Sequence, residues 1–406
     1  MMQYHLCFLL FFSIFIHSKC DPINVIVHSK KVEDGESIMH ATVDSISELR
    51  YVLNGLEHIT CVSIENQIVE TLPKGFLAGH KIEKFHMSFN QLKEVEPGAF
   101  EDSYISELKL VNNKIRIIRT GVLNNLKFIT VNFANNPIFQ IEDGAFENSS
   151  IFSLVIIENR LSNLTSKMFN GSYISNFWFG DGTINDIETD TFRNVSGLYG
   201  INLEGNHIHN IGEVFCNLTS LRSLNLNHNF IKLLRPGSFN GTCLDYLYLK
   251  NNSLTRINAG TFINLPIPEI DLSYNFISTL QEGAFEDVQA LKLDLSHNKL
   301  TRIANNIFND SDINKLILDD NDIVDIDEDA FEKISGLVTL SLKGNKLTKI
   351  KNGMLPQMSI ILLQRNEIAS IERRALNNLK FSLDHHKALA DNPVKLVKLD
   401  ERYCVV

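Results

Sequence analysis

Histidine, carboxylate and cysteine side chains are the groups of this chain that could carry catalysis or hold a metal. The pair His385-His386 and the pair His207/His209 have no metal-ligating partners at a recognisable spacing. No nucleophile elbow, phosphate-binding loop or zinc signature occurs in the sequence. We therefore expect a protein that is not an enzyme and that binds no cofactor and no metal.

A run of carboxylates between Asp319 and Asp329 suggests calcium binding at first sight. The run lacks the glycine and the ligand spacing of a calcium-binding hand. Ile323 and Ile326 within it also fall at core positions of the repeat described below. We interpret the run as solvated carboxylates. A basic run follows at Lys343, Lys346, Lys349 and Lys351. We interpret it as ordinary surface, with binding of sulfated sugars as the alternative.

The N-terminus predicts entry into the secretory pathway. Leu6 to Ile16 is an almost unbroken apolar stretch, too short to span a bilayer, and Ser18 is a plausible last residue before cleavage. No later segment is apolar enough to span a membrane, so we expect a secreted, extracellular protein without membrane insertion of its own. The net charge of −10 argues against nucleic acid as a partner.

The cysteines then fall in a compartment that favours disulfides. Cys216 and Cys243 lie in consecutive repeats, and Cys20 and Cys61 flank the N-terminal cap. We predict a bridge within each pair, with buried free thiols as the alternative. Cys404 is left over, either for a bond to a second chain or as a capped thiol.

Eight N-x-S/T sequons predict a glycoprotein. They occur at Asn148, Asn163, Asn170, Asn194, Asn217, Asn240, Asn251 and Asn309. Six of them fall eleven or twelve residues after the landmark position of the repeat, which predicts sugars on the convex side.

The elements that must position these residues are short strands that recur every 23 or 24 residues. In the clearest copy, Leu221–Ile231 (LRSLNLNHNFI), the leucines stand at places one, four and six, and Asn229 stands at place nine. The alternation is typical of a half-buried strand, which buries too little surface to fold alone and must stack on copies of itself. The landmark asparagine recurs at Asn66, Asn90, Asn113, Asn136, Asn159, Asn206, Asn229, Asn252, Asn275, Asn298, Asn321, Asn345 and Asn366, with Gly182 in its place in one copy.

Two further columns should complete the core. One consists of aliphatic residues five places past the asparagine, such as Ile118 and Ile257. The other consists mostly of phenylalanines ten places past it, such as Phe100 and Phe262. Since this periodicity explains most of the phenylalanines, we assign them to the core and not to a ligand pocket. The asparagine amide is expected to bond backbone groups that the turn leaves unpaired.

The pattern L-x-x-L-x-L-x-x-N-x-L, with a phenylalanine near the repeat end, resembles the typical extracellular class of leucine-rich repeats. That class includes Toll-receptor ectodomains, small leucine-rich proteoglycans and secreted insect immune proteins. The resemblance covers about Cys61 to Leu379 and implies an α/β repeat solenoid, a horseshoe with a parallel β-sheet on its concave face and loops or short helical turns outside. The cysteine-rich end caps of the class are absent. We expect a signal peptide at 1–18, an N-terminal cap at 19–63, about 14 repeats at 64–378, and a C-terminal cap and polar tail at 379–406.

Places three, five and seven point off the concave sheet, so their side chains are free for recognition. Trp178, the only tryptophan, stands at place five of the copy in which Gly182 replaces the asparagine. We predict a partner-binding patch on the concave face at Val155, Ile157, Asn176, Trp178, Asn202, Tyr246, Tyr248 and Asp271. The alternative is that Trp178 folds over its neighbours and shields the sheet, or that this copy has merely drifted.

The sequence thus predicts a secreted leucine-rich repeat glycoprotein that binds a protein or glycan partner through its concave face. The resemblance suggests innate immunity or cell-surface signalling as its setting. The alternative is a structural component of the extracellular matrix, linked into disulfide-bonded oligomers through Cys404.

Overall fold

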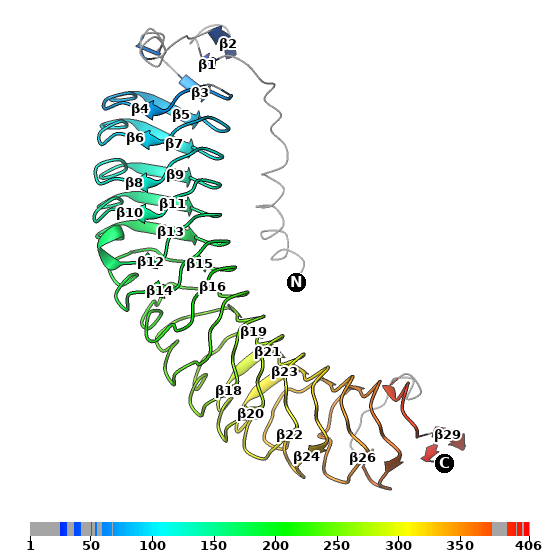
Figure 1. Cartoon of the computed structure of the whole chain (residues 1–406). Coiled ribbons are helices and arrows are strands. Elements are labelled where there is room, and N and C mark those ends of the chain that lie inside the picture. Colours follow the sequence, from blue (N-terminus) through cyan, green and yellow to red (C-terminus); the bar gives the residue numbers. More distant parts are fainter. Residues whose placement is uncertain are drawn as a thin grey trace.

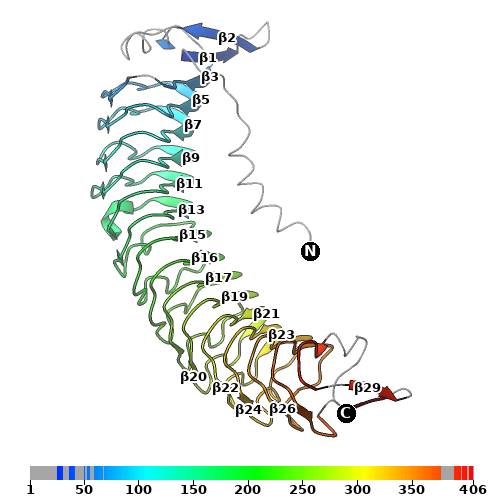
Figure 2. The same ribbon diagram turned by 45° about the vertical axis from the view of Figure 1, so that its right-hand side comes forward.

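The chain forms a curved solenoid of stacked repeats. The computed structural model describes residues 25–30, 36–41, 50, 53–54, 59–66, 68–375, 388–394, 396–399 and 402–405. Figure 1 shows the long strands side by side along the inner curve and the short strands along the outer curve. The view in Figure 2, turned by 45°, shows the same arc.

The concave side is a single 16-stranded sheet. In spatial order its strands are β2 (Glu36–Ala41), β1 (Val25–Lys30), β3 (Ile59–Ser63), β5 (Lys81–His86), β7 (Tyr104–Lys109), β9 (Lys127–Asn132), β11 (Ser150–Val155), β13 (Tyr173–Trp178), β15 (Gly200–Asn202), β16 (Ser223–Asn225), β17 (Tyr246–Tyr248), β19 (Glu269–Asp271), β21 (Gln289–Asp294), β23 (Asp312–Ile317), β25 (Thr339–Ser341) and β27 (Ile360–Leu362). From β3 onward all pairs are parallel, whereas β1 pairs antiparallel with both β2 and β3. This antiparallel edge lies where the sequence predicts a cap.

The convex side consists of turns and two-residue strands. These strands pair as β4 (Thr71–Leu72) with β6 (Glu94–Val95), β8 (Ile117–Ile118) with β10 (Gln140–Ile141), β12 (Asn163–Leu164) with β14 (Asp186–Ile187), β18 (Arg256–Ile257) with β20 (Thr279–Leu280), β22 (Arg302–Ile303) with β24 (Asp325–Ile326), and β26 (Lys349–Ile350) with β28 (Ser370–Ile371). From residue 68 to residue 375 the only helix is the short 3-10 helix η1 (Ser166–Phe169). The helical part of the α/β expectation is therefore not confirmed.

The turns of the convex side explain why it contains so little helix. Gly98 and Gly237, each eight residues past a landmark asparagine, adopt φ of 78° and 81°. This left-handed conformation is the one in which glycine ends a helix, and it recurs at the same place in several repeats. The chain therefore turns at this point in repeat after repeat and does not wind into a helix.

The landmark asparagines bond backbone groups as expected, and their amides follow one another from repeat to repeat; we call this series the ladder. Asn229 is typical: its Nδ2 donates to the carbonyls of Leu226 in its own repeat (3.1 Å) and Leu203 in the preceding one (2.9 Å). Its Oδ1 accepts from the backbone N–H of Ile208 at 3.0 Å. Each such amide therefore satisfies backbone groups of two repeats that the turn leaves unpaired.

The two ends of the ladder differ from the expectation. The pairing of Ser63 with His86 puts Asn66 at place eight, where it is exposed with φ of 56°, so Asn66 is not a ladder residue. At the other end Asn392 joins the ladder, since its Nδ2 donates to the carbonyl of Leu363 at 2.8 Å. The segment expected to be a polar tail thus completes one more turn, after which β29 (Leu396–Leu399) pairs antiparallel with β30 (Arg402–Val405).

The phenylalanine column stacks through the core. Phe239, Phe262, Phe285, Phe308 and Phe331 lie in neighbouring repeats with ring centroids 5.4–6.1 Å apart. All five are buried. Their assignment to the core, rather than to a ligand pocket, is confirmed.

The predicted bridge between Cys216 and Cys243 is not formed, because both residues are free thiols. After subtraction of one repeat they stand four positions apart along the chain. Cys216 Sγ instead donates to the carbonyl of Gly237 at 3.0 Å. Burial, with the nearby Glu213 carboxylate, raises the pKa of the Cys216 thiol. Cys20 lies outside the described residues, and of Cys404 only the backbone in β30 is described, so the remaining cysteine predictions stay predictions.

Candidate concave binding site

The register of the sheet gathers the predicted residues on one surface. Val155 on β11 pairs with Trp178 on β13, and Trp178 pairs with Asn202 on β15. One strand further along, β16, separates Asn202 from Tyr248 on β17, which pairs with Asp271 on β19. Seven of the eight predicted residues stand at place five or place three of their repeats, and Ile157 stands at place seven.

Burial divides these residues. Trp178, Ile157, Asn176 and Asn202 are half-buried, so they present part of their surface on the concave face. Val155, in contrast, is only 8 % exposed, so it fills the floor of the patch and was wrongly predicted to stand out from it. A valine between two rows of larger side chains is covered by them because its own side chain is short.

A sector of the concave face carries no charge. It comprises places two, three, five and seven of the repeats that contain β9, β11 and β13, together with the start of the next repeat. We call this set the neutral sector: Ile129, Thr130, Asn132, Ala134, Phe152, Ser153, Val155, Ile157, Ser175, Asn176, Trp178, Gly180, Tyr199, Gly200 and Asn202. Charged residues make up 21 % of the chain, so their absence from these positions distinguishes the sector from the rest of the surface.

Three exposed apolar side chains of this sector were missed by sequence reasoning. Ile129 is 60 %, Phe152 47 % and Tyr199 55 % exposed, all at place two. The exposed Tyr173 adjoins them at the start of β13. The two consecutive variable positions in L-x-x-L were the available signal, because places two and three both leave the core there.

Asn132 was also missed. Its side chain is 1 % exposed, and its Oδ1 accepts from the backbone N–H of Ala134 at 2.9 Å. Its Nδ2 has no hydrogen-bond partner among the described residues. A buried donor of this kind costs free energy until an acceptor reaches it.

Ion pairs border the neutral sector on its N-terminal side. On β7, Glu107 accepts a hydrogen bond from His86 at 3.0 Å and pairs with Lys109. The bond from His86, with the contribution of Lys109, outweighs burial and lowers the pKa of Glu107 to about 2. The rim here is therefore charged but internally compensated.

On the C-terminal side of the neutral sector, too, charged side chains compensate one another. Lys292 Nζ lies 3.2 Å from Glu269 and 3.8 Å from Asp294. Burial opposes the charge of Lys292, but Glu269, Asp294 and Asp271 outweigh it and raise its pKa. Burial and the carboxylate of Glu269 together raise the pKa of Tyr248, which remains a neutral hydroxyl. Asp271 uses its Oδ1 to accept the Ser273 N–H at 2.9 Å. The half of the predicted patch around Tyr246, Tyr248 and Asp271 is thus a polar border.

The ladder is interrupted in the repeat that contains Trp178, where Gly182 takes the place of the asparagine. Asn159 bonds only within its own repeat, to the Ile156 carbonyl at 2.7 Å and the Leu161 N–H at 2.9 Å. A side-chain carbon placed at Gly182 would come within 2.8 Å of Asn159 Nδ2 and 2.9 Å of Asn206 Oδ1. The glycine therefore gives room for the amides of both neighbours.

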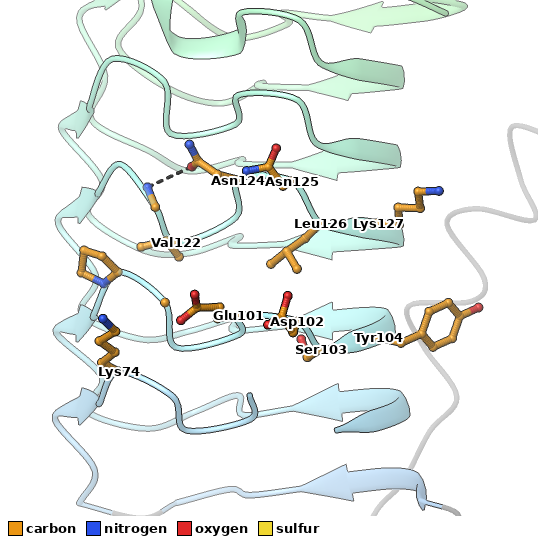
Figure 3. A pocket seen from close by; sticks show the side chains of 13 residues that line it. Lys74, Glu101, Asp102, Ser103, Tyr104, Val122, Asn124, Asn125, Leu126 and Lys127 are labelled. Carbon is orange, nitrogen blue, oxygen red and sulfur yellow. Dashed lines mark hydrogen bonds between the residues drawn. The ribbon is translucent and has the colours of Figure 1, made fainter. Parts of the chain in front are cut away.

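A cavity of about 610 Å³ lies elsewhere, on the flank where the chain returns to the sheet. Figure 3 shows its side chains spread apart, with Lys74 at one end and Tyr104 and Lys127 at the other. The hydrogen bond drawn there joins the Gly121 N–H to Asn124 Oδ1 at 2.9 Å. Because no group of side chains converges there, the cavity shows no arrangement for chemistry. Nor do any three histidine, cysteine or acidic side chains of the described residues gather to hold a metal.

The sequon asparagines lie at the surface, with one exception. Asn148, Asn163, Asn170, Asn194, Asn217, Asn240 and Asn251 are exposed, whereas Asn309 is half-buried. Asn148 stands two residues before β11 and Asn170 three residues before β13. These two asparagines border the neutral sector on the side where its strands begin.

The comparison with family models agrees with the repeat architecture. A family model described as a BspA type leucine rich repeat region matches residues 36–151, 116–245 and 255–382. No curated protein sequence matches the chain. Among solved structures, a leucine-rich repeat protein of Leptospira interrogans, LIC12759, is 19 % identical, with a TM-score of 0.49 over 75 % of this chain and 82 % of that chain. Toll, in its complex with Spatzle from Drosophila, is 16 % identical, with a TM-score of 0.49; the match covers 82 % of this chain and 60 % of that one.

Proposed function

Because the chain belongs to the BspA-type leucine-rich repeat family, we propose that it is a binding protein without enzymatic activity whose concave face receives a protein partner. Repeat proteins of this kind offer a long curved surface whose outward residues are not needed by the core. The proposal concerns which part of that surface makes the contact and how.

The neutral sector carries the proposal. The buried centre of a protein interface is depleted in charged residues and enriched in aromatic ones, while its rim is polar. The sector has this composition: Phe152 lies on β11, Trp178 on the neighbouring β13 and Tyr199 directly before β15, with Glu107 and Glu204 at its borders. An exposed apolar patch of this kind marks an interaction site on a soluble protein.

We also propose that the protein is a secreted glycoprotein. The apolar stretch Leu6 to Ile16 and the seven exposed sequon asparagines support this. Within the described residues no helix is long and apolar enough to cross a membrane. Innate immunity and cell-surface signalling are the settings that the sequence resemblance suggests.

The test is capture of a partner from extracellular fluid by the full chain and by two matched variants. Trp178→Ala should weaken capture by roughly thirtyfold in Kd, since a central aromatic contributes on the order of 2 kcal/mol. Ile317→Ala is the control, because Ile317 also stands at place five but on β23, outside the neutral sector. Equal capture by the wild type and by Trp178→Ala contradicts the proposal. A glycan in place of a protein among the captured molecules contradicts the class of partner proposed.

A further inference from the structure

Aromatic rings are exposed along the edge of the solenoid where the concave strands end. Phe230 is 46 %, Tyr274 47 % and Phe276 56 % exposed, at places eight and ten of their repeats. The core does not use these rings, and they lie outside the neutral sector. An apolar cluster on a soluble protein calls for something that covers it.

One sequon, Asn251-Asn252-Ser253, lies at the centre of these rings. The backbone N–H of Asn251 donates to the Ser273 carbonyl at 3.0 Å, which sets Asn251 beside Tyr274 of the next repeat. The N–H of Ser253 donates to the Ile231 carbonyl, directly after Phe230, at 2.9 Å. The N–H of Phe276 likewise donates to the Leu254 carbonyl, directly after Ser253, at 2.9 Å. Phe230 and Phe276 therefore flank the sequon from both sides.

Asn251 differs from the other seven sequon asparagines in its place. It adjoins the buried ladder residue Asn252, whereas the others lie four, eleven or twelve residues past the ladder position. Its side chain is exposed, and its Nδ2 lies 2.8 Å from His228 Nδ1. Its φ of 53° is one that asparagine tolerates well. A sugar on this nitrogen starts from the middle of the aromatic cluster.

Neighbouring side chains hold two of the rings in place. His207 and His209 both have ring centroids 5.6 Å from that of Phe230. The Tyr274 ring stacks on His297 at 4.1 Å, and Lys250 Nζ lies 4.9 Å from its centroid. These contacts leave exposed ring surface on either side of Asn251, prepared for an apolar face to dock.

We propose that the N-linked glycan of Asn251 folds back onto Phe230 and Phe276 and shields this edge. The proposal rests on the glycoprotein part of the proposed function. Asn251 Nδ2 attacks the anomeric carbon of an oligosaccharide carried on a lipid pyrophosphate; a C–N bond forms, the C–O bond to the carrier breaks, the lipid pyrophosphate leaves, and the amide loses one proton. The C–H faces of the first sugars then cover the aromatic rings, and their hydroxyls face water.

The exposed rings could be covered either by the glycan of Asn251 or by a docked protein, and the position of Asn251 favours the glycan. A protein docked on these rings would have to cover Asn251, which stands between them. A glycan on Asn251 already fills that footprint and buries the rings without a second molecule. The edge is therefore closed to partners, whereas the neutral sector stays open.

The experiment measures how fast peptide:N-glycanase removes each glycan from the native full chain made in a eukaryotic secretory host, with site occupancy followed by mass spectrometry. Asn240 is the reference site, because it lies on the other edge, away from these rings. Release at Asn251 should be slower by about tenfold, which corresponds to about 1.4 kcal/mol of docking free energy. In the variant Phe230→Ala/Phe276→Ala the two rates should become equal. Ser253→Ala, which removes the glycan but keeps Asn251, should increase the binding of an apolar dye.

Release at Asn251 as fast as at Asn240 in the wild type overturns the proposal, even if the double variant fails to fold. A bare Asn251 beside an occupied Asn240 also overturns it and leaves the glycoprotein assignment standing. A chain that carries no sugar at any sequon overturns both. The capture test with Trp178→Ala is independent of all three outcomes.

Discussion

Most ladder asparagines join two repeats through both ends of the amide, so a single residue type sets the spacing of the stack. Asn206 donates to the Phe179 carbonyl of the glycine-containing copy (2.8 Å), and its Oδ1 accepts the Ile184 N–H of the same copy (3.0 Å). Asn159, on the other side, turns its amide inward to its own repeat. Ladder amides therefore join the copy that contains Trp178 and Gly182 to the next repeat only, although its backbone pairs with the repeats on both sides.

This geometry gives a prediction for Gly182→Asn, which the repeat pattern by itself suggests should stabilise the protein. The new side chain must displace the amides of Asn159 and Asn206, because even a Cβ lies within 3 Å of both. We expect the free energy of unfolding to fall by about 1 to 3 kcal/mol. Urea unfolding measures it. A midpoint above that of the wild type contradicts the expected clash.

A second residue-scale prediction concerns acid stability. The bond from His86 and the charge of Lys109 lower the pKa of Glu107 from its ordinary 4.5 to about 2. The unfolded state therefore binds more protons between these values, so the stabilisation is present above pH 4.5 and is lost as the pH falls toward 2. Glu107→Gln should flatten the dependence of unfolding free energy on pH in this window. The exposed Glu83→Gln serves as the control, and a slope unchanged in Glu107→Gln contradicts the prediction.

At the scale of elements, neighbouring repeats compensate each other's charge. Lys346 pairs with Asp322 at 2.7 Å, and Lys351 pairs with Asp325 at 2.6 Å. These pairs lower the pKa values of both aspartates. The acidic run and the basic run, which look like two separate surface features in the sequence, thus meet across one repeat. Being exposed, such pairs contribute little to stability.

The phenylalanine column predicts how a core defect spreads. Phe262 stacks on Phe239 at 6.1 Å and on Phe285 at 5.4 Å. Phe262→Ala should cost about 3 to 5 kcal/mol. Because each repeat contacts only its neighbours, protection from hydrogen exchange should fall most around Asn252 and Asn275. Phe139→Ala, at a half-exposed ring, is the control. Uniform loss of protection along the chain contradicts this local behaviour.

At the scale of the whole molecule, the sequons predict a pattern of glycosylation. The seven exposed asparagines can carry a glycan in the folded protein. Asn309 is half-buried, and its Oδ1 is enclosed without a hydrogen-bond partner among the described residues. The half-buried side chain leaves less room for a sugar than the seven exposed asparagines do. Mass spectrometry of protein secreted from a eukaryotic host should find Asn309 unoccupied. Full occupancy of Asn309 contradicts this interpretation.

The sequence by itself determined the repeat, its core and its ladder, because each of these depends on a period that the chain repeats many times. Leu224, Asn229 and Phe239 all lie where that period places them. Turns with a recurring left-handed glycine take the place of the helical part of the α/β expectation. The sequence did not predict Asn392 as a ladder residue, because its repeat keeps little of the leucine pattern.

Only the tertiary structure decided which outward residues form a surface. Trp178 stood out in the sequence by its rarity, yet Phe152 and Tyr199, which lie 26 and 21 residues away along the chain, join the same surface only because β11 and β15 both pair with β13. Burial of Val155 likewise depends on the side chains of adjacent strands. The period fixes which face a residue takes, but the neighbours across the sheet fix what that face presents to a partner.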